Sequence, residues 1–365
     1  MIAFIVGTTA ELIKIAPVHH ELVARGRATE IWYTGQHVDE LADTLADLHL
    51  PAPDVWLVPQ AGARNLVRPA DVPRWLLRVA ATVVRRRRWL ARRLVSDGRP
   101  PIVLVHGDTF TAPIGALVGR LLGARVGHVE AGMRSGSLLH PFPEELNRRV
   151  AGRLVDLHFP PTAREAGHLR RHRGAVVTTG ANTILDAMRE ALAEPVREGL
   201  DLPDAFGLAT LHRFELVRNA DLFRTALETL RKHSSALPIV VFAGASERER
   251  MAEYGLLDLF DDEHLLLRDK LSYVAFQPVL ARATFVVTDS GGLQEESAHL
   301  GIPCAVHRVH TERLDGEGRS MVLTGFSTDK LDDFLTHYER YRGDRTLDAH
   351  RPSAVIVDAL EALGR

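Results

Sequence analysis

The sequence predicts an α/β protein made of two Rossmann-like, doubly wound domains that face each other across a cleft. Short, continuous apolar runs alternate with longer amphipathic segments, as in parallel sheets covered by helices on both faces. The chain has 365 residues, which is too long for one ordinary hydrophobic core. The alternating pattern divides near residues 163–175, so we expect one domain at 1–170 and a second at 171–350.

The first set of apolar runs predicts the strands of the first domain, and apolar residues at helical spacing between them predict its helices. The predicted helices include Ala10–Arg25 and Ala112–Leu122. The predicted strands are Ile2–Val6, Glu30–Tyr33, Ile102–Val105, Val126–Val129 and Leu157–Phe159.

The segment 74–97, RWLLRVAATVVRRRRWLARRLVSD, is the strongest charge run of the chain. We predict a packed helix with a solvated basic face; a subunit contact or attraction to an anionic surface is the alternative. The predicted apolar face consists of Leu76, Val79, Ala80, Val83, Val84, Leu90 and Leu94.

The second set of apolar runs predicts the second sheet, with a helix at Leu222–His233. In doubly wound folds, ligands bind beyond the carboxyl ends of the strands, and the unusual residues of this sequence follow predicted strands. The predicted strands are Val176–Thr178, Phe206–Thr210, Ile239–Phe242, Leu265–Leu267, Phe285–Val287 and Cys304–Val306.

Composition excludes several classes of protein. The net charge of −2 and pI near 6.8 give no overall field that would draw the chain to nucleic acid or a membrane. Cys304 is the only cysteine, which excludes an internal disulfide and a thiolate metal cluster. No stretch approaches the roughly 20 apolar residues of a transmembrane helix, and the apolar start is too short for a signal peptide. We therefore expect a cytoplasmic protein.

Common catalytic motifs are missing from the sequence. It has no HExxH, no P-loop, no GxSxG and no GxGxxG after the first predicted strand. Hydride transfer and Ser-triad hydrolysis are therefore poorly supported, and we expect neither a metal nor a cofactor.

A glycine turn follows a predicted strand in VVTDSGGLQEES, residues 286–297. Gly291 and Gly292 let a phosphate approach the backbone, where amides at a helix start point toward it, and Ser290 adds a hydroxyl donor. Glu295 and Glu296 fall in the first helical turn, where a carboxylate offsets the helix dipole or binds ribose hydroxyls. An ordinary strand–helix turn with a serine N-cap is the alternative.

The stretch GHVEAGMRSGSLLHPFPEELNRR, residues 127–149, places Glu130, Glu144 and Glu145 after a predicted strand. Acidic residues are common in loops because water solvates them well. A pair of carboxylates can also serve to remove a proton from a bound group and return it. Other polar residues follow strands in the same way. They are Lys14 after FIVGTT, His212 and Arg213 in LHRFE, and Arg313 in HTERLD.

An ordered set of motifs over nearly the whole chain resembles the UDP-N-acetylglucosamine 2-epimerase family. The motifs are TGQH (34–37), HGDT (106–109), GHVEAGMRSG (127–136), PFPEELNRR (141–149), HFPPT (158–162), TGANTILDA (179–187), LHR (211–213), TDSGGLQEES (288–297) and TER (311–313). The resemblance implies a GT-B-like fold whose last helix, about 351–365, packs back on the first domain. It also implies a homodimer and a place in cell-surface polysaccharide biosynthesis.

The resemblance implies inversion at C2 of a UDP-N-acetylhexosamine, such as UDP-GlcNAc to UDP-ManNAc. The C2 hydrogen has no adjacent carbonyl to acidify it, so the family is understood to expel UDP from C1 and form a 2-acetamidoglucal. UDP then adds back after a proton reaches the opposite face of C2. Such a route needs an acid/base group on each face and donors on the departing diphosphate.

Residue by residue, the resemblance implies catalytic roles for Asp108, Glu130, Glu144 and His212. It implies UDP-sugar binding by Ser290, Gly291, Gly292 and Glu296, with Lys14, Arg134, Arg213 and Arg313 as further binding residues. Which carboxylate serves which face stays open.

Several positions depart from the family pattern. GTRPE has become GTTAE, with Thr9 in place of the arginine and Ala10 in place of the proline. HRREN has become HRFEL, with Phe214 in place of the second arginine, and the HxNP segment is unrecognisable in FAGASERER (242–250). The proposed catalytic residues are retained, whereas residues around them have changed. This combination suggests a divergent member of the family that acts on the family's substrate or on a close analogue of it.

Three other functions compete with a sugar-nucleotide epimerase. A hydrolysing 2-epimerase would release free ManNAc and UDP. A GT-B transferase would need an acceptor, and the crowd of carboxylates on one sugar argues against it. A nucleotide-sugar-binding protein that has lost catalysis is a different class, made plausible by Thr9 and Phe214.

Overall fold

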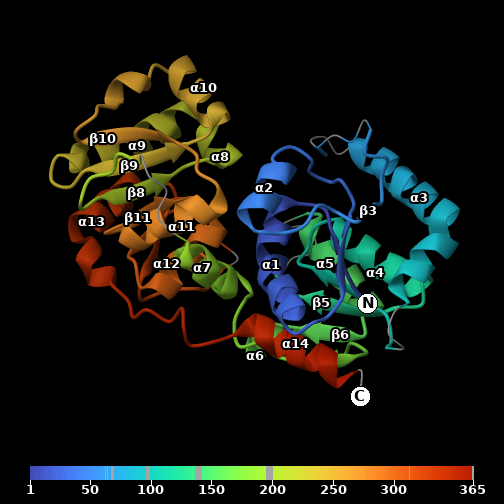
Figure 1. The fold of residues 1–365 in the computed structure, drawn as a ribbon. Helices are drawn as coiled ribbons and strands as arrows, with labels where there is room; N and C mark the ends of the chain where they lie inside the picture. The colour runs from blue at the N-terminus through green and yellow to red at the C-terminus, as the bar shows by residue number, and fades with distance from the viewer. Residues whose placement is uncertain are drawn as a thin grey trace. The chain divides into compact units, whose positions relative to one another are not determined.

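The computed structural model describes residues 1–61, 63, 65–66, 70–95, 99–135, 142–194, 200–311 and 313–363. The chain forms two compact units (Figure 1): Met1–Glu190 with His350–Arg365, and Ala191–Ala349. No helix in the described ranges is both long and apolar enough to cross a membrane.

The first unit contains a parallel sheet with the strand order β3-β2-β1-β4-β5-β6-β7. Adjacent strands pair in parallel register, with the topological switch point between β1 and β4. The strands are β1 (Ile2–Val6), β2 (Thr29–Tyr33), β3 (Val55–Trp56), β4 (Ile102–His106), β5 (Arg125–Val129), β6 (Leu157–Phe159) and β7 (Ala175–Val176).

Buried residues of α3, α4 and α5 complete the apolar cluster of the first sheet. The helices up to the boundary of this unit are α1 (Thr9–Ala24), α2 (Leu41–Asp47), α3 (Asp71–Leu94), α4 (Thr111–Leu121), α5 (Glu144–Leu154), α6 (Ala163–His168) and α7 (Ile184–Ala193), whose last residues lie beyond Glu190, where the unit ends. The last helix, α14 (Pro352–Ala362), belongs to the same unit and packs against α1. Arg25 of α1 pairs with Asp358 at 2.5 Å, and Asp186 of α7 accepts a hydrogen bond from the Ser353 amide at 2.7 Å.

The second unit repeats the same parallel topology, with the order β10-β9-β8-β11-β12-β13 and its switch point between β8 and β11. The strands are β8 (Gly207–Thr210), β9 (Ile239–Ala243), β10 (Leu265–Asp269), β11 (Val286–Thr288), β12 (Cys304–Val306) and β13 (Met321–Leu323). The helices are α8 (Phe214–Val217), α9 (Ala220–Ser234), α10 (Ala245–Glu253), α11 (Tyr273–Arg282), α12 (Gly291–Leu300) and α13 (Thr328–His337), with 3-10 turns η1 (Leu257–Leu259) and η2 (Tyr338–Tyr341).

Both faces of the second sheet are buried, because successive strand residues enter different apolar clusters. Val240 packs in one cluster and its neighbours Ile239 and Val241 in the other. This alternation explains why the strands read as unbroken apolar runs. The predicted α/β class with two Rossmann-like sheets is confirmed.

Three details of the prediction were wrong. Strands β3 and β13 were not predicted. The strand predicted at Val176–Thr178 is β7, at the edge of the first sheet instead of in the second. On α3, Leu76, Ala80 and Val84 are exposed instead of packed, with Val84 75% exposed. The buried stripe lies one residue earlier in each turn and begins at Trp75, whose indole donates to the carbonyl of Thr34 at 2.8 Å. The stripe continues through Val79, Val83, Leu90 and Leu94.

Candidate active site

The loop after β1 is built around a buried carboxylate on α1. Thr8 caps α1, and Glu11 reaches back to accept hydrogen bonds from the amides of Gly7 at 2.8 Å and Thr8 at 3.0 Å. The other oxygen of Glu11 accepts from the hydroxyl of Thr109, beyond β4, at 2.7 Å. Burial raises the pKa of Glu11 to about 7, although these hydrogen bonds act in the opposite direction. Glu11 therefore links the two loops at the switch point.

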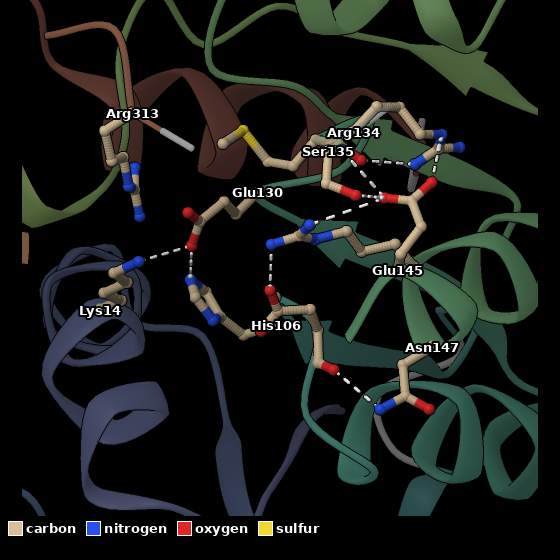
Figure 2. A network of polar contacts seen from close by, with 12 residues as sticks. Lys14, His106, Glu130, Arg134, Ser135, Glu145, Asn147 and Arg313 are labelled. Carbon is tan, nitrogen blue, oxygen red and sulfur yellow. Dashed lines mark hydrogen bonds and ion pairs between the residues drawn. The ribbon is translucent and has the colours of Figure 1, made fainter. Parts of the chain in front are cut away.

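Glu130 follows β5 and lies at the centre of a buried polar cluster (Figure 2). Its Oε2 is 2.6 Å from Nζ of Lys14 on α1 and 3.2 Å from Nε2 of His106 at the end of β4. The backbone of Glu130 has φ of 61°, in the left-handed region that non-glycine residues seldom occupy. This conformation costs about 1–3 kcal/mol and persists where surrounding contacts over-determine it, often at functional sites.

Asp108 follows β4, and two residues of α5 hold it. Its carboxylate pairs with Arg148, and its carbonyl accepts a hydrogen bond from the Asn147 side chain at 2.9 Å. Arg148 is itself buried, and its other guanidinium nitrogen is 3.7 Å from Glu145. Two residues of helix α5, Asn147 and Arg148, therefore set the position of Asp108; Asn147 is labelled in Figure 2.

The neighbouring glutamates at the start of α5 have different surroundings. Glu145 is fully buried; Arg149 pairs with it at 2.7 Å and the Ser135 amide donates to it at 3.1 Å. Burial would raise the pKa of Glu145, but these partners bring it below its usual range. Glu144 is half-buried, and within the described residues its Oε2 is a buried atom with no hydrogen-bond partner. Glu144 is thus the better placed of the two to meet a ligand.

Arg134, predicted to bind substrate, lies beside Glu145. Its Nε is 3.9 Å from the Glu145 carboxylate, and one guanidinium nitrogen donates to the carbonyl of Met133 at 2.7 Å. Burial lowers the pKa of Arg134, and the nearby arginines act in the same direction. The structure thus brings Lys14, Asp108, Glu130, Arg134 and Glu144 to the carboxyl ends of strands in one unit.

A small hollow beside Glu130 contains further hydrogen-bonding groups. Within the described residues, the side-chain nitrogen of Asn182 and the hydroxyl of Thr183 are buried without a hydrogen-bond partner. Buried polar groups normally have partners, so these two groups are candidates for contact with a ligand. The hollow is lined by Val129, Glu130, Phe159, Pro161, Thr179, Ala181, Asn182 and Thr183.

The second unit places the predicted phosphate turn at its own switch point. Ser290 is the N-cap of α12, and its hydroxyl accepts from the Leu293 amide at 3.4 Å. Gly291 and Gly292 form the first turn of that helix. The orphan amides of a helix start, with no side chain in front of them, make a site suited to an anion.

His212 follows β8, and Asp289 follows the neighbouring strand β11. The two side chains lie against each other. Nδ1 of His212 is 3.2 Å from one Asp289 oxygen. The other oxygen accepts from the amides of His212 at 2.9 Å and Arg213 at 2.8 Å. Asp289 is fully buried, which raises its pKa, whereas the His212 side chain is 51% exposed. Within the described residues the Asp289 oxygen nearest to Nδ1 is a buried atom with no hydrogen-bond partner, so the imidazole lies beside the carboxylate without an aligned hydrogen bond.

Glu296 and Arg313 both have protein partners. Gln277 on α11 donates to Glu296 at 2.8 Å, and Arg313 pairs with Glu295 at 2.7 Å. Glu295, His299 and Asp315 place possible ligand atoms within 4.8 Å of one another. The guanidinium of Arg313 already neutralises Glu295, which makes this group a poor cation site.

Four residues of this network escaped the sequence prediction: His106, Asn147, Arg148 and Asp289. Each lies within a motif that was noted, no more than four residues from a predicted site residue. Their pairings join residues far apart in the chain, so only the fold brings them together. His106 and Asp289 follow or end buried strands, and that position was the one available signal.

The departures from the family pattern lie on loops and helix starts. Thr9 is the first residue of α1 and is half-buried, and Ala10 is exposed. Phe214 begins α8 with 70% of its surface exposed, and the Arg218 guanidinium lies 4.6 Å from its ring. The segment 242–250 is the end of β9 and most of α10.

A family model described as UDP-N-acetylglucosamine 2-epimerase matches residues 20–346. The chain is 32% identical to UDP-N-acetylglucosamine 2-epimerase of Bacillus subtilis, over 89% of this chain and 83% of that protein. Its fold is similar to UDP-GlcNAc 2-epimerase of Neisseria meningitidis bound to UDP-GlcNAc, with a TM-score of 0.77, 26% identity and 99% of each chain covered. It is also similar to the Methanocaldococcus jannaschii enzyme in complex with UDP-GlcNAc and UDP, with a TM-score of 0.76, 26% identity and 99% of each chain covered.

Proposed function

The chain belongs to the UDP-N-acetylglucosamine 2-epimerase family, and we propose from this that it is a non-hydrolysing isomerase of a UDP-N-acetylhexosamine. The substrate pair is UDP-GlcNAc and UDP-ManNAc or a close analogue. The observation that carries the proposal is the Lys14–Glu130–His106 cluster beside Asp108, at the carboxyl ends of adjacent strands.

In the proposed reaction, a carboxylate removes the C2 proton as the bond between C1 and the UDP oxygen breaks. The products of this half-reaction are a 2-acetamidoglucal and UDP. A second acidic group then donates a proton to the opposite face of C2 while the UDP oxygen bonds to C1 again. Glu130 and Asp108 are the proposed proton-transfer groups, with Glu144 as the third candidate. Their negative charge also stabilises the positive character that develops at C1.

The second unit supplies the proposed contacts with the departing diphosphate. The hydroxyl of Ser290 and the amides of Gly291 and Gly292 offer donors, and Arg213 and Arg313 offer positive charge. His212 can give a proton to the leaving phosphate, because Asp289 supports the imidazolium form. Glu296 is proposed to accept from ribose hydroxyls. The donors and positive charges around the diphosphate stabilise the negative charge of UDP, which is greater after C1–O cleavage than before it.

We also propose a homodimer. On α3, Leu77 and Val84 are 71% and 75% exposed, and on α4, Leu117 and Leu121 are 48% and 47% exposed. Arg87 of α3 donates to the carbonyl of Leu121 at 3.2 Å, so the two helices are neighbours. An exposed apolar surface shared by two helices is typical of a subunit contact.

The proposed reaction is tested by NMR of UDP-GlcNAc incubated with the protein in heavy water. We expect UDP-ManNAc to accumulate to equilibrium, with deuterium at C2 of both sugar nucleotides. Free ManNAc and UDP would instead support the hydrolysing alternative. Absence of deuterium at C2 across a panel of UDP-sugars would support a binding protein. Glu130→Gln should abolish exchange, whereas Glu339→Gln, an exposed position in the second unit, should leave it unchanged.

A further inference from the structure

His106 is a buried histidine that no step of the proposed reaction uses directly. It ends β4 with only 3% of its surface exposed. Its Nε2 is 3.2 Å from Oε2 of Glu130 but has no aligned hydrogen-bond partner within the described residues, whereas Lys14 Nζ donates to the same oxygen at 2.6 Å. Figure 2 shows the ammonium and the imidazole approaching this carboxylate from two sides. Neither of these two contacts uses Oε1 of Glu130.

We propose that His106 is a positioning residue that holds the Glu130 carboxylate in place and tunes its strength as a base. This inference rests on the proposed function, since it requires Glu130 to exchange a proton with C2. His106 itself forms no bond to the sugar. The C2–H bond breaks, an O–H bond forms on Glu130, and the imidazole keeps its own proton count.

The imidazole acts in its neutral form. Burial lowers the pKa of His106, and this effect outweighs the opposing effect of the nearby Glu130; the charge of Lys14 lowers the pKa further. The other titratable groups around it are Asp108 after β4 and His128 on β5. Burial lowers the pKa of His128 to about 4, so it is neutral as well, and its Nε2 contacts the Gly107 carbonyl at 2.7 Å.

A neutral donor at Nε2 has a different effect on Glu130 from a second cation. The ammonium of Lys14 compensates the negative charge of the carboxylate, but its side chain is flexible and fixes the orientation of the carboxylate poorly. The rigid imidazole at the end of a central strand defines where Oε2 lies. Because it is uncharged, it stabilises the carboxylate less than a second positive charge would, and Glu130 stays basic enough to take a proton.

The test compares His106→Leu and His106→Gln with the unchanged protein. Leucine removes the donor, whereas the glutamine amide can replace Nε2–H without titrating. For His106→Leu we expect kcat to fall about tenfold and the acidic limb of the kcat pH profile to move upward by about one pH unit. We expect KM to change less than twofold, and His106→Gln to return the limb to its original pH.

His158→Gln is the matched control, because His158 is also fully buried in the same sheet. Its Nε2 lies 2.9 Å from the Arg173 carbonyl. All variants are first compared by circular dichroism and thermal melting. A folded His106→Leu variant with the original pH profile would overturn the inference, as would an equal shift in His158→Gln.

A second readout separates this inference from the proposed function. The carboxyl pKa of Glu130 can be followed by 13C NMR of labelled protein without any substrate. A higher carboxyl pKa in His106→Leu supports the inference even if no C2 exchange is found, in which case only the proposed function fails. An unchanged carboxyl pKa together with normal C2 exchange overturns only the inference.

Discussion

Three of the proposed acid/base side chains, Glu130, Asp108 and His212, each lie against a charged partner from another element. Lys14 of α1 pairs with Glu130, Arg148 of α5 with Asp108, and Asp289 after β11 with His212. Such pairs are costly to break, because the remaining charge stays in a poorly solvated position. They also fix the geometry of groups that must transfer protons.

Replacing Lys14 tests the first of these pairs. Lys14→Met leaves the 9% exposed Glu130 without its cation, so the carboxyl should hold its proton more strongly and fail as a base. We expect kcat/KM to fall about 100-fold or more, measured by UDP-ManNAc formation. Lys330→Met, on the exposed face of α13, is the control. Full activity in Lys14→Met would remove Glu130 from the proposed mechanism.

Replacing Asp289 tests the histidine pair. Asp289→Asn can still accept from the His212 and Arg213 amides, but it no longer supports a positive imidazole. We expect a fall in kcat of about 100-fold or more, measured by UDP-ManNAc formation. The surface pair of His337 and Asp333, 3.0 Å apart, gives the control variant Asp333→Asn. An unaltered kcat in Asp289→Asn would argue against acid catalysis by His212.

At the scale of elements, Glu11 joins the β1–α1 loop to the β4–α4 loop, and its protonation should affect stability. Its pKa is about 7 in the folded chain against 4.5 as the reference value, so the folded state binds the extra proton between these values. The contribution of Glu11 to the free energy of unfolding is therefore fully present below pH 4.5 and is lost progressively as the pH rises through 7. The loss is about 3 kcal/mol at most.

The measurement is urea unfolding at several pH values between 4.5 and 8. We expect the free energy of unfolding to fall with rising pH more steeply for the unchanged protein than for Glu11→Gln, which cannot ionise. Glu21→Gln, farther along the same helix, should keep the original slope. Parallel pH curves for all three proteins would show that Glu11 is ionised in both states.

The same scale shows what the sequence could predict. Strands such as β1 and β9 are buried on both faces, so they read as continuous apolar runs and were predicted within a residue or two. Strands β3 and β13 lie at sheet edges and each has only one buried residue, so neither shows the unbroken buried apolar run of a central strand. On α3, two adjacent apolar stripes fit helical spacing, and only packing decides which is buried.

The candidate site shows the same limit. Glu130 and Ser290 could be proposed from the sequence because each follows a buried strand, where ligands bind in doubly wound folds. Asp108 was proposed only from the resemblance of its HGDT motif to the family. The partners of the candidate residues could not be predicted from the sequence, because Arg148 reaches Asp108 and Asp289 reaches His212 only through tertiary packing. The roles proposed for Arg134, Glu296 and the other binding residues stay predictions.

At the scale of the whole molecule, the exposed apolar side chains of α3 and α4 predict association. Leu77→Glu with Val84→Glu places two carboxylates on this surface, and we expect light scattering to show a shift from dimer to monomer. The control is Leu257→Glu, at a 42% exposed position in the second unit. A monomeric unchanged protein would contradict the proposed dimer directly.

The return of the chain to its first unit has a consequence for biosynthesis. Helix α14 buries Ile356, Val357 and Leu360, and it packs on α1. The whole Ala191–Ala349 unit is synthesised between these two helices and can fold before α14 has been made. During that interval the apolar surface of α1 that α14 later covers is exposed to water, and exposed apolar surface of this kind is what chaperones bind.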